Sequence, residues 1–296
     1  MDYLVYILIP IIIVVILLML ILLEKHERKR IFKPKKYSEG WSYPMHGYYI
    51  DENKMVTFES DKVMLNGYIY GENNTNGLVI IVHSMHVPSD YYIPEALFLA
   101  KEGFKVFMYD TTGFWKNEGK FTGFKRAVRD LENAIEYIDD GSMPISIMGH
   151  GMGGYAAISV LNFTKKKIAN VISVAAPYSE KAYIKSKMSG VKGVLVSMLQ
   201  NASNRKYYKK DVIDGINGCE SKDTFFCIIH GKHDEEVNYS TLSIQSRQEA
   251  ITNKNVQFML LEDESDTHMG IVRPDKEKPM VNEEILGYVT ELFYSC

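Results

Sequence analysis

The stretch that decides the fold runs Ile145-Ser146-Ile147-Met148-Gly149-His150-Gly151-Met152-Gly153-Gly154. A short apolar run typical of a strand leads into a glycine-rich turn, and a segment of small residues typical of a helix follows. Glycines on both sides of a central residue permit a very sharp turn, which lifts the central position above the edge of a sheet. The start of the next helix offers backbone N–H groups and a positive dipole end. The pattern predicts a reactive turn, yet its central residue, Gly151, has no side chain.

Outward from this turn, apolar strands alternate with amphipathic helices. Leu78–Val82 is an unbroken apolar run, as expected of a strand buried on both faces. The alternation indicates a mainly parallel sheet with helices on both faces. The remaining strands are expected at 55–59, 63–70, 104–109, 145–148, 171–175, 225–229 and 256–261, and the helices at 95–101, 124–139, 153–163 and 283–294.

The N-terminal segment differs from the rest of the chain. Residues 3–23 carry no charge and are almost all Ile, Leu, Val or Met. About 20 such residues cross a hydrocarbon core of about 30 Å. A cleaved signal peptide is disfavoured because the apolar run is long, no positive charge precedes it and no small-residue cleavage site follows. Basic residues between Lys25 and Lys36 follow the run, which predicts a single-pass anchor in the cell membrane with the globular domain cytoplasmic.

The predicted organisation has three parts. Residues 1–30 form the transmembrane anchor with its basic flank, residues 31–54 a linker rich in Tyr, Gly and Pro, and residues 55–296 an α/β domain. About fifty residues separate two expected strands of that domain, more than one crossover helix needs. We therefore expect a small cap insertion at about 177–222, with an ordinary surface excursion as the alternative.

Composition excludes several classes of protein. With 46% hydrophobic and 24% charged residues in 296, the chain is not mainly disordered, and a net charge of −3 gives no general attraction to nucleic acid. The three cysteines are too scattered for a disulfide framework or a zinc site. Histidines lack the helical spacing of metal ligands, so no metal and no cofactor are expected; those considered are His83, His86, His230 and His233.

The turn at 149–153 resembles the nucleophile elbow of α/β-hydrolases, in particular the group of monoacylglycerol lipases and serine aminopeptidases. The resemblance extends over about residues 55–296 and implies the α/β-hydrolase fold, with a mostly parallel eight-stranded sheet and helices on both faces. That group carries Ser where this sequence has Gly151. Asn117 stands near a position where the family usually has Ser.

The same resemblance assigns roles to other residues. It implies that Asp234, in His230-Gly231-Lys232-His233-Asp234, is the catalytic acid and that His268, in Asp266-Thr267-His268-Met269-Gly270, is the base. It implies that Met85 and Met152 supply the two N–H groups of an oxyanion hole, and that Ser84 replaces a usual Gly. Nucleophile, acid and histidine follow one another in the order that this fold requires. Glu235 and Glu236 are expected to be solvated, either one being a substitute acid.

Gly151 leaves the activity open, because glycine has no atom that attacks a carbonyl. One reading is residual hydrolysis of an ester, acyl or peptide substrate by a water that His268 activates. In that reading Ser84 is a weaker substitute nucleophile, since it would need rotation toward His268. The alternative is a catalytically inactive pseudo-hydrolase that binds a ligand or partner at the membrane, similar to the N-myc downstream-regulated family. An engineered inactive form ranks last. Basic and aromatic cap residues make a lipid-derived substrate plausible; they are Tyr183, Lys185, Lys187, Arg205, Lys206, Tyr207 and Tyr208.

Overall fold

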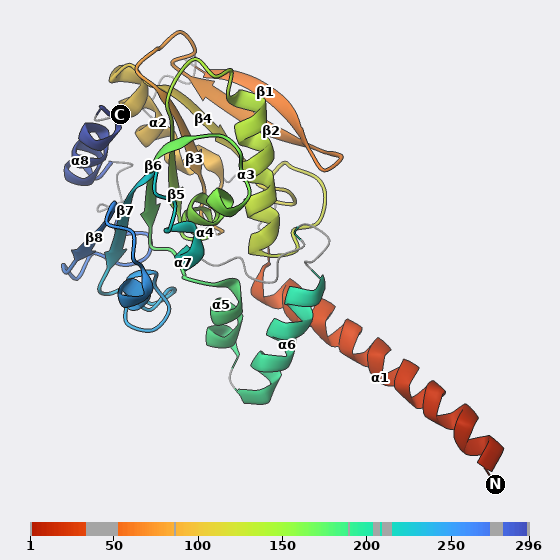
Figure 1. Ribbon diagram of the computed structural model, residues 1–296. Helices are drawn as coiled ribbons and strands as arrows, with labels where there is room; N and C mark the ends of the chain where they lie inside the picture. The colour runs from red at the N-terminus through yellow and green to blue at the C-terminus, as the bar shows by residue number, and fades with distance from the viewer. Residues whose placement is uncertain are drawn as a thin grey trace.

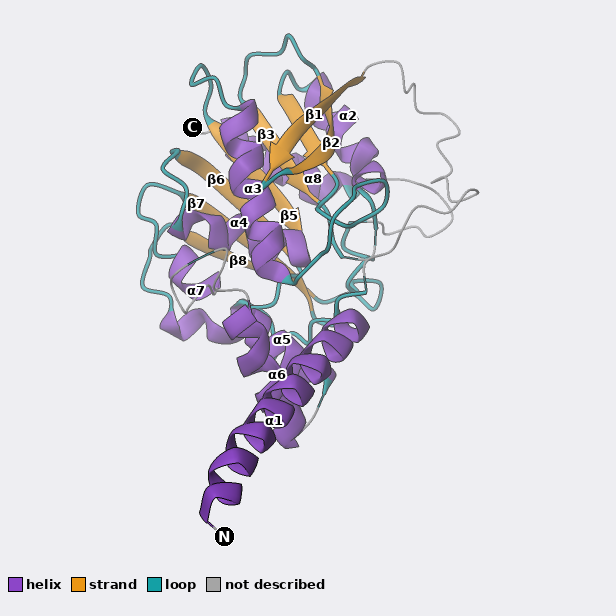
Figure 2. Ribbon diagram, turned by 90° about the vertical axis from the view of Figure 1, so that its right-hand side faces the viewer, coloured by secondary structure: helices purple, strands orange, loops and turns teal. Residues whose placement is uncertain are grey.

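The computed structural model describes residues 2–33, 53–85, 87–188, 190–203, 208, 215–272 and 281–294. Within them, eight strands form one sheet, and helices cover both of its faces (Figures 1 and 2). Most of the predicted linker, 34–52, lies outside the described residues, as do His86, Arg205, Lys206 and Tyr207.

The sheet has the order β1-β2-β4-β3-β5-β6-β7-β8. β2 runs antiparallel to both β1 and β4, and each remaining neighbouring pair is parallel. The predicted fold class, a mostly parallel eight-stranded α/β-hydrolase sheet, is confirmed. The strands are β1 (Asn53–Ser60), β2 (Val63–Tyr70), β3 (Leu78–Val82), β4 (Lys105–Tyr109), β5 (Ile145–His150), β6 (Ile168–Val174), β7 (Phe225–Gly231) and β8 (Val256–Leu261).

Two hydrophobic cores fill the space between the sheet and its helices. Side chains of β3 alternate between them: Ile80 and Val82 enter the core that α3 and α4 cover, while Val79 and Ile81 enter the core of α2 and α8. Burial on both faces explains why this strand is apolar throughout. The helices are α1 (Asp2–Ile31), α2 (Ile93–Lys101), α3 (Phe124–Ile138), α4 (Met152–Ser159), α5 (Glu180–Lys187), α6 (Gly190–Ser203), α7 (Gly215–Gly218) and α8 (Glu283–Tyr294), with 3-10 turns η2 (Ser89–Tyr92), η3 (Val160–Asn162) and η5 (Gln245–Ala250).

The N-terminal helix α1 projects from the domain (Figure 1). Within its segment Tyr6–Ile31, the most apolar window has a mean hydropathy of 3.4 and no buried residue. The helix is therefore long and apolar enough to cross a membrane. The C-terminal end of α1, in contrast, packs against the domain, because Phe32, the next residue, is buried among the rings of Phe121, Phe124 and Tyr183.

Helix α6 lies beside the end of α1. Lys192 Nζ is 2.5 Å from a carboxylate oxygen of Glu27, and the Ser203 hydroxyl donates to Glu24 at 3.5 Å. α5 and α6 occupy the stretch between β6 and β7, where the cap insertion is predicted. This hairpin thus connects the end of the apolar helix to the α/β domain.

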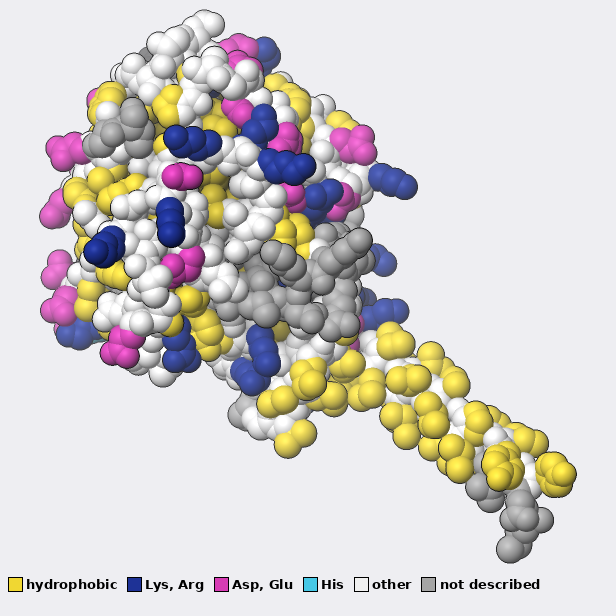
Figure 3. Space-filling view, viewed as in Figure 1, with side chains coloured by type: hydrophobic (Ala, Val, Ile, Leu, Met, Phe, Trp, Pro, Cys, Tyr) yellow, Lys and Arg dark blue, Asp and Glu magenta, His cyan; other side chains and the backbone are white. Residues whose placement is uncertain are grey.

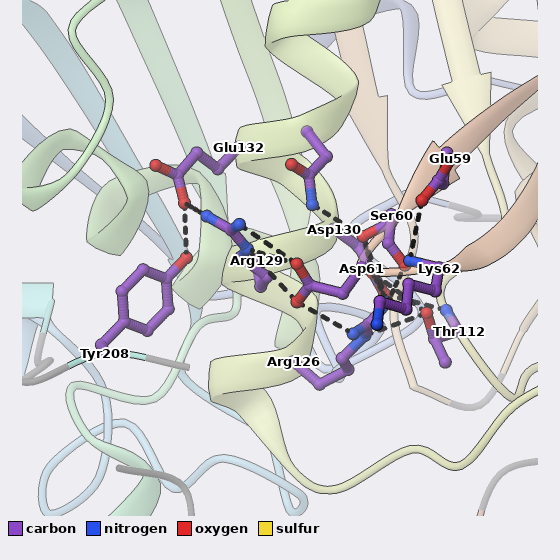
Figure 4. A network of polar contacts seen from close by, with 11 residues as sticks. Glu59, Ser60, Asp61, Lys62, Thr112, Arg126, Arg129, Asp130, Glu132 and Tyr208 are labelled. Atoms are coloured by element: carbon purple, nitrogen blue, oxygen red, sulfur yellow. Dashed lines mark hydrogen bonds and ion pairs between the residues drawn. The ribbon is translucent and has the colours of Figure 1, made fainter. Parts of the chain in front are cut away.

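A buried ion pair ties the hairpin of β1 and β2 to helix α3 (Figure 4). Arg126 Nη2 lies 2.8 Å from Asp130 Oδ1, and both side chains are almost fully buried. The Asp130 carboxylate also accepts the Ser60 hydroxyl at 2.6 Å and the amide N–H of Thr112 at 2.9 Å. Since Thr112 follows β4, three separate segments converge on one carboxylate.

Replacing that carboxylate should destabilise the domain strongly. In Asp130→Ala, Arg126 stays buried without its nearest counter-charge, which costs about 3–5 kcal/mol. Urea unfolding in detergent micelles measures the change. As a control, Lys54→Ala removes an exposed pair with Glu72 and should leave the unfolding midpoint unchanged. Equal effects of the two substitutions would contradict the prediction.

Candidate active site

The turn between β5 and α4 has the geometry that its glycines predict. Gly151 adopts φ +54° and ψ −113°, a conformation that residues with side chains rarely adopt. A Cβ atom at Gly149 would lie 2.2 Å from the carbonyl oxygen of Gly153, and one at Gly153 would lie 2.1 Å from that of Val82. Both flanking positions therefore exclude any side chain, and α4 begins tightly against the end of β3.

The predicted acid and base meet below this turn. His268 Nδ1 lies 2.9 Å from Asp234 Oδ2, although the two residues are 34 positions apart in the chain. The other carboxylate oxygen of Asp234 accepts the amide N–H groups of Glu236 and Val237, both at 2.8 Å. The ring is oriented so that a Cβ atom added at Gly151 would be 2.9 Å from His268 Nε2. The structure thus brings Gly151, Asp234 and His268 together as the sequence predicted.

The electrostatics of this pair suit a base held ready to accept a proton. Burial alone would lower the pKa of His268, but the hydrogen bond and charge of Asp234, with the charge of Glu236, outweigh burial and raise it above 6.5. Burial alone would raise the pKa of Asp234, yet hydrogen bonds from His230, His268 and the Val237 amide hold it well below its usual value. Asp234 is therefore a carboxylate throughout the physiological range.

The prediction that Ser84 needs rotation to reach His268 is wrong. Ser84 Oγ already lies 3.5 Å from His268 Nε2, the long limit of a hydrogen bond and typical of unliganded sites. A Cβ atom at Gly151 would sit 2.7 Å from this oxygen. The hydroxyl thus occupies space that a side chain at position 151 would need.

A second set of buried groups fixes the residues around His268. Tyr92 OH donates to His150 Nδ1 at 2.6 Å and accepts the amide N–H of Ser84 at 3.2 Å. His150 Nε2 donates to the carbonyl oxygen of His268 at 2.8 Å, and the two imidazole rings stack with centroids 4.8 Å apart. Burial, reinforced by the charge of His268, lowers the pKa of His150 to about 3, so its ring is neutral and keeps these roles.

Sequence reasoning missed these supporting residues. Nothing in the sequence relates Tyr92 to the turn, whereas His150 stands next to Gly151 and was the available signal. Glu236, expected in solvent, is only partly exposed and has a carboxylate oxygen 4.0 Å from His268 Nε2. Met85 and Met152, the predicted oxyanion-hole residues, lie in the loop after β3 and at the first position of α4. A first helical residue has no intrahelical carbonyl partner for its N–H.

The part of the chain that the structure describes contains no set of metal ligands. No group of three or more His, Cys, Asp or Glu side chains there is arranged to hold a metal ion. The imidazoles near the site are instead engaged with carbonyl groups, carboxylates and a tyrosine hydroxyl.

Comparisons with known proteins agree with this architecture. The family model described as serine aminopeptidase, S33 matches residues 73–216. A search of the curated proteins found no match. The esterase Pf2001 of Pyrococcus furiosus is 21% identical with a TM-score of 0.64, covering 88% of this chain and 98% of its own.

Two further solved structures have the same fold. Est1E from Butyrivibrio proteoclasticus, solved with ferulic acid, is 18% identical with a TM-score of 0.57, covering 81% of this chain and 96% of its own. The enol-lactonase of Burkholderia xenovorans LB400 is 15% identical with a TM-score of 0.56, covering 80% of this chain and 99% of its own. At these identities the likeness shows the fold, and the activities are those of the other proteins.

The pKa of His268 should depend on Asp234. NMR titration of the imidazole signals should give a value above 6.5 in the unmodified chain. In Asp234→Asn the charge is lost while burial remains, so the pKa should fall below 6.5. His150, with its pKa of about 3, is the internal control and should stay neutral in both proteins. An unchanged His268 titration would mean that the two side chains do not interact.

Proposed function

We propose that this chain, which has the α/β-hydrolase fold and matches the serine aminopeptidase, S33 model over residues 73–216, is a membrane-anchored hydrolase acting on acyl esters, with His268 as the general base. The observation that carries the proposal is the hydrogen bond of 2.9 Å between His268 Nδ1 and Asp234 Oδ2 beneath the elbow. It leaves His268 Nε2 facing the position where a carbonyl carbon is attacked in this fold.

The buried carboxylate supports a site built for proton transfer. An unpaired charge in a protein interior costs several kcal/mol, so Asp234 is tolerated because two amides and His268 compensate it. This arrangement fixes the tautomer of His268 with its proton on Nδ1 and stabilises the imidazolium that forms when Nε2 takes up a proton. Glu236, near the same nitrogen, adds to that stabilisation.

The apolar helix supports a location at a membrane. Side chains along α1 from Tyr6 to Leu22 are apolar and, apart from the half-buried Leu20, exposed, and Figure 3 shows a continuous hydrophobic surface along this helix. Exposed apolar residues of α6, namely Val191, Val194 and Met198, lie on the domain beside the end of α1. The basic residues that follow the apolar run favour a cytoplasmic domain. A substrate with an acyl chain would then reach the domain from the membrane that holds α1.

Hydrolysis should depend on His268 and not on His233. A short-chain p-nitrophenyl ester presented to the full chain in detergent should turn over, with a rate that rises with pH as His268 loses its proton. His268→Ala should reduce this rate by about 10³-fold or more. His233→Ala is the matched control, since His233 is an exposed histidine of the acid loop, and should leave the rate unchanged. Equal silence of all three proteins would instead favour the binding-module alternative.

Membrane attachment can be tested on the full chain. Alkaline carbonate should leave the protein in the membrane pellet, and protease added outside intact cells should not cut the domain. The double variant Ile13→Lys, Val14→Lys is the control: both side chains are exposed on α1, and each charge costs about 2.5–3.5 kcal/mol at the bilayer centre. Release of the unmodified chain, at the same level as the variant, would reject the anchor.

A further inference from the structure

We propose that Ser84 is the nucleophile of this site, taking the place that position 151 holds elsewhere in the superfamily. The inference rests on the proposed function and extends it to a specific residue. It starts from two distances: Ser84 Oγ is 3.5 Å from His268 Nε2, and a Cβ atom at Gly151 would be 2.7 Å from the same oxygen. One hydroxyl therefore stands beside the base, in the space left by the missing side chain.

The strand register explains why these two positions are interchangeable. β3 and β5 are parallel neighbours, and Val82 pairs with Gly149. Ser84 and Gly151 each lie two residues beyond this pair, at the same edge of the sheet. The two loops leave the sheet at the same point, and the distance of 2.7 Å shows that side chains at these two positions would reach one place. Moving the hydroxyl from the β5 loop to the β3 loop changes its attachment but keeps it next to the base.

The backbone of Ser84 is held on both sides. Its N–H donates to Tyr92 OH at 3.2 Å, and its carbonyl oxygen accepts a hydrogen bond from His83 Nδ1 at 2.7 Å. His83 Nε2 in turn accepts the amide N–H of Thr111 at 3.0 Å, which fixes the tautomer that can donate from Nδ1. The backbone is thus fixed, Ser84 as a residue is only 1% exposed, and its hydroxyl lies beside His268.

The resulting chemistry balances without a cofactor. His268 Nε2 takes the Ser84 hydroxyl proton as Oγ bonds to the ester carbonyl carbon, and the tetrahedral intermediate collapses when the C–O bond to the leaving alcohol breaks and His268 returns the proton to that alcohol. A water, deprotonated by His268, then attacks the Ser84 ester and releases the carboxylic acid, with the proton restored to Ser84 Oγ.

The two predicted oxyanion donors keep their use with exchanged roles. In an ordinary elbow, one donor is the N–H of the residue after the nucleophile and the other comes from the loop after β3. With Ser84 as nucleophile, Met85 is the residue after it, and Met152, at the N-terminus of α4, belongs to the opposite loop. With Ser84 as nucleophile, we assign the oxyanion of the intermediate to these two N–H groups.

Covalent labelling tests the assignment directly. The full chain in detergent is treated with a small fluorophosphonate, digested, and mapped by mass spectrometry. The adduct should be on Ser84, and both Ser84→Ala and His268→Ala should abolish it. Ser84→Ala should also lower p-nitrophenyl ester turnover by about 10³-fold. Ser89→Ala is the matched control, being another buried serine after β3, and should label and turn over like the unmodified chain.

A reciprocal exchange separates this inference from the proposed function. In Ser84→Gly, Gly151→Ser the crowding at 2.7 Å disappears, so the adduct should move to position 151. Turnover that survives Ser84→Ala within about threefold but is lost in His268→Ala would reject Ser84 and leave hydrolysis standing, with water as the nucleophile. Labelling of the exchange variant alone, with an inert unmodified chain, would overturn both.

Discussion

The parallel pairing of β3 with β5 at the centre of the sheet is the constraint on which the site depends. Because Val82 lies opposite Gly149, the loops after the two strands begin at the same height and share one small volume. The flanking glycine at position 153 lets α4 pack closely against the end of β3, which keeps the space between the two loops small. A side chain from either loop can fill it, but not one from each without displacement. The serine at position 84 and the glycine at position 151 therefore depend on each other, because the missing side chain at 151 leaves the space that the Ser84 hydroxyl occupies.

The charge below this volume gives the arrangement chemical meaning. A carboxylate as deeply buried as Asp234 is stable only when its oxygens are all engaged. Two backbone amides satisfy one oxygen, and His268 with His230 satisfies the other. The same interactions raise the pKa of His268. The stability of the buried carboxylate and the basicity of the imidazole thus come from one set of contacts. The remaining ring nitrogen, Nε2, lies 3.5 Å from the Ser84 hydroxyl and 4.0 Å from the Glu236 carboxylate.

The sequence predicts the features that depend on local patterns, but not those that depend on contacts between distant segments. The sheet and the elbow are encoded locally, in apolar runs and glycine spacing, and were predicted from them. Asp234 and His268 were predicted from the resemblance of two short motifs to those of a known family. The place of Ser84 was not, because it depends on a contact between two loops 67 residues apart in the sequence and on a side chain that is missing from one of them. The roles of Tyr92 and His150 were not predicted for the same reason, because single buried hydrogen bonds between distant segments leave no periodic pattern in the sequence.

Backbone strain distinguishes the two places for a hydroxyl. The central residue of an elbow is held at positive φ, which costs about 1–3 kcal/mol for a residue with a side chain. Gly151 adopts φ +54° without that cost. Ser84 is not among the non-glycine residues with positive φ in the described chain, so its loop carries the hydroxyl in ordinary backbone geometry. In the usual elbow the sharp turn itself aims the nucleophile. Here hydrogen bonds from Ser84 to Tyr92 and from His83 to Ser84 do so, and the strain of the turn is not needed to place oxygen beside nitrogen.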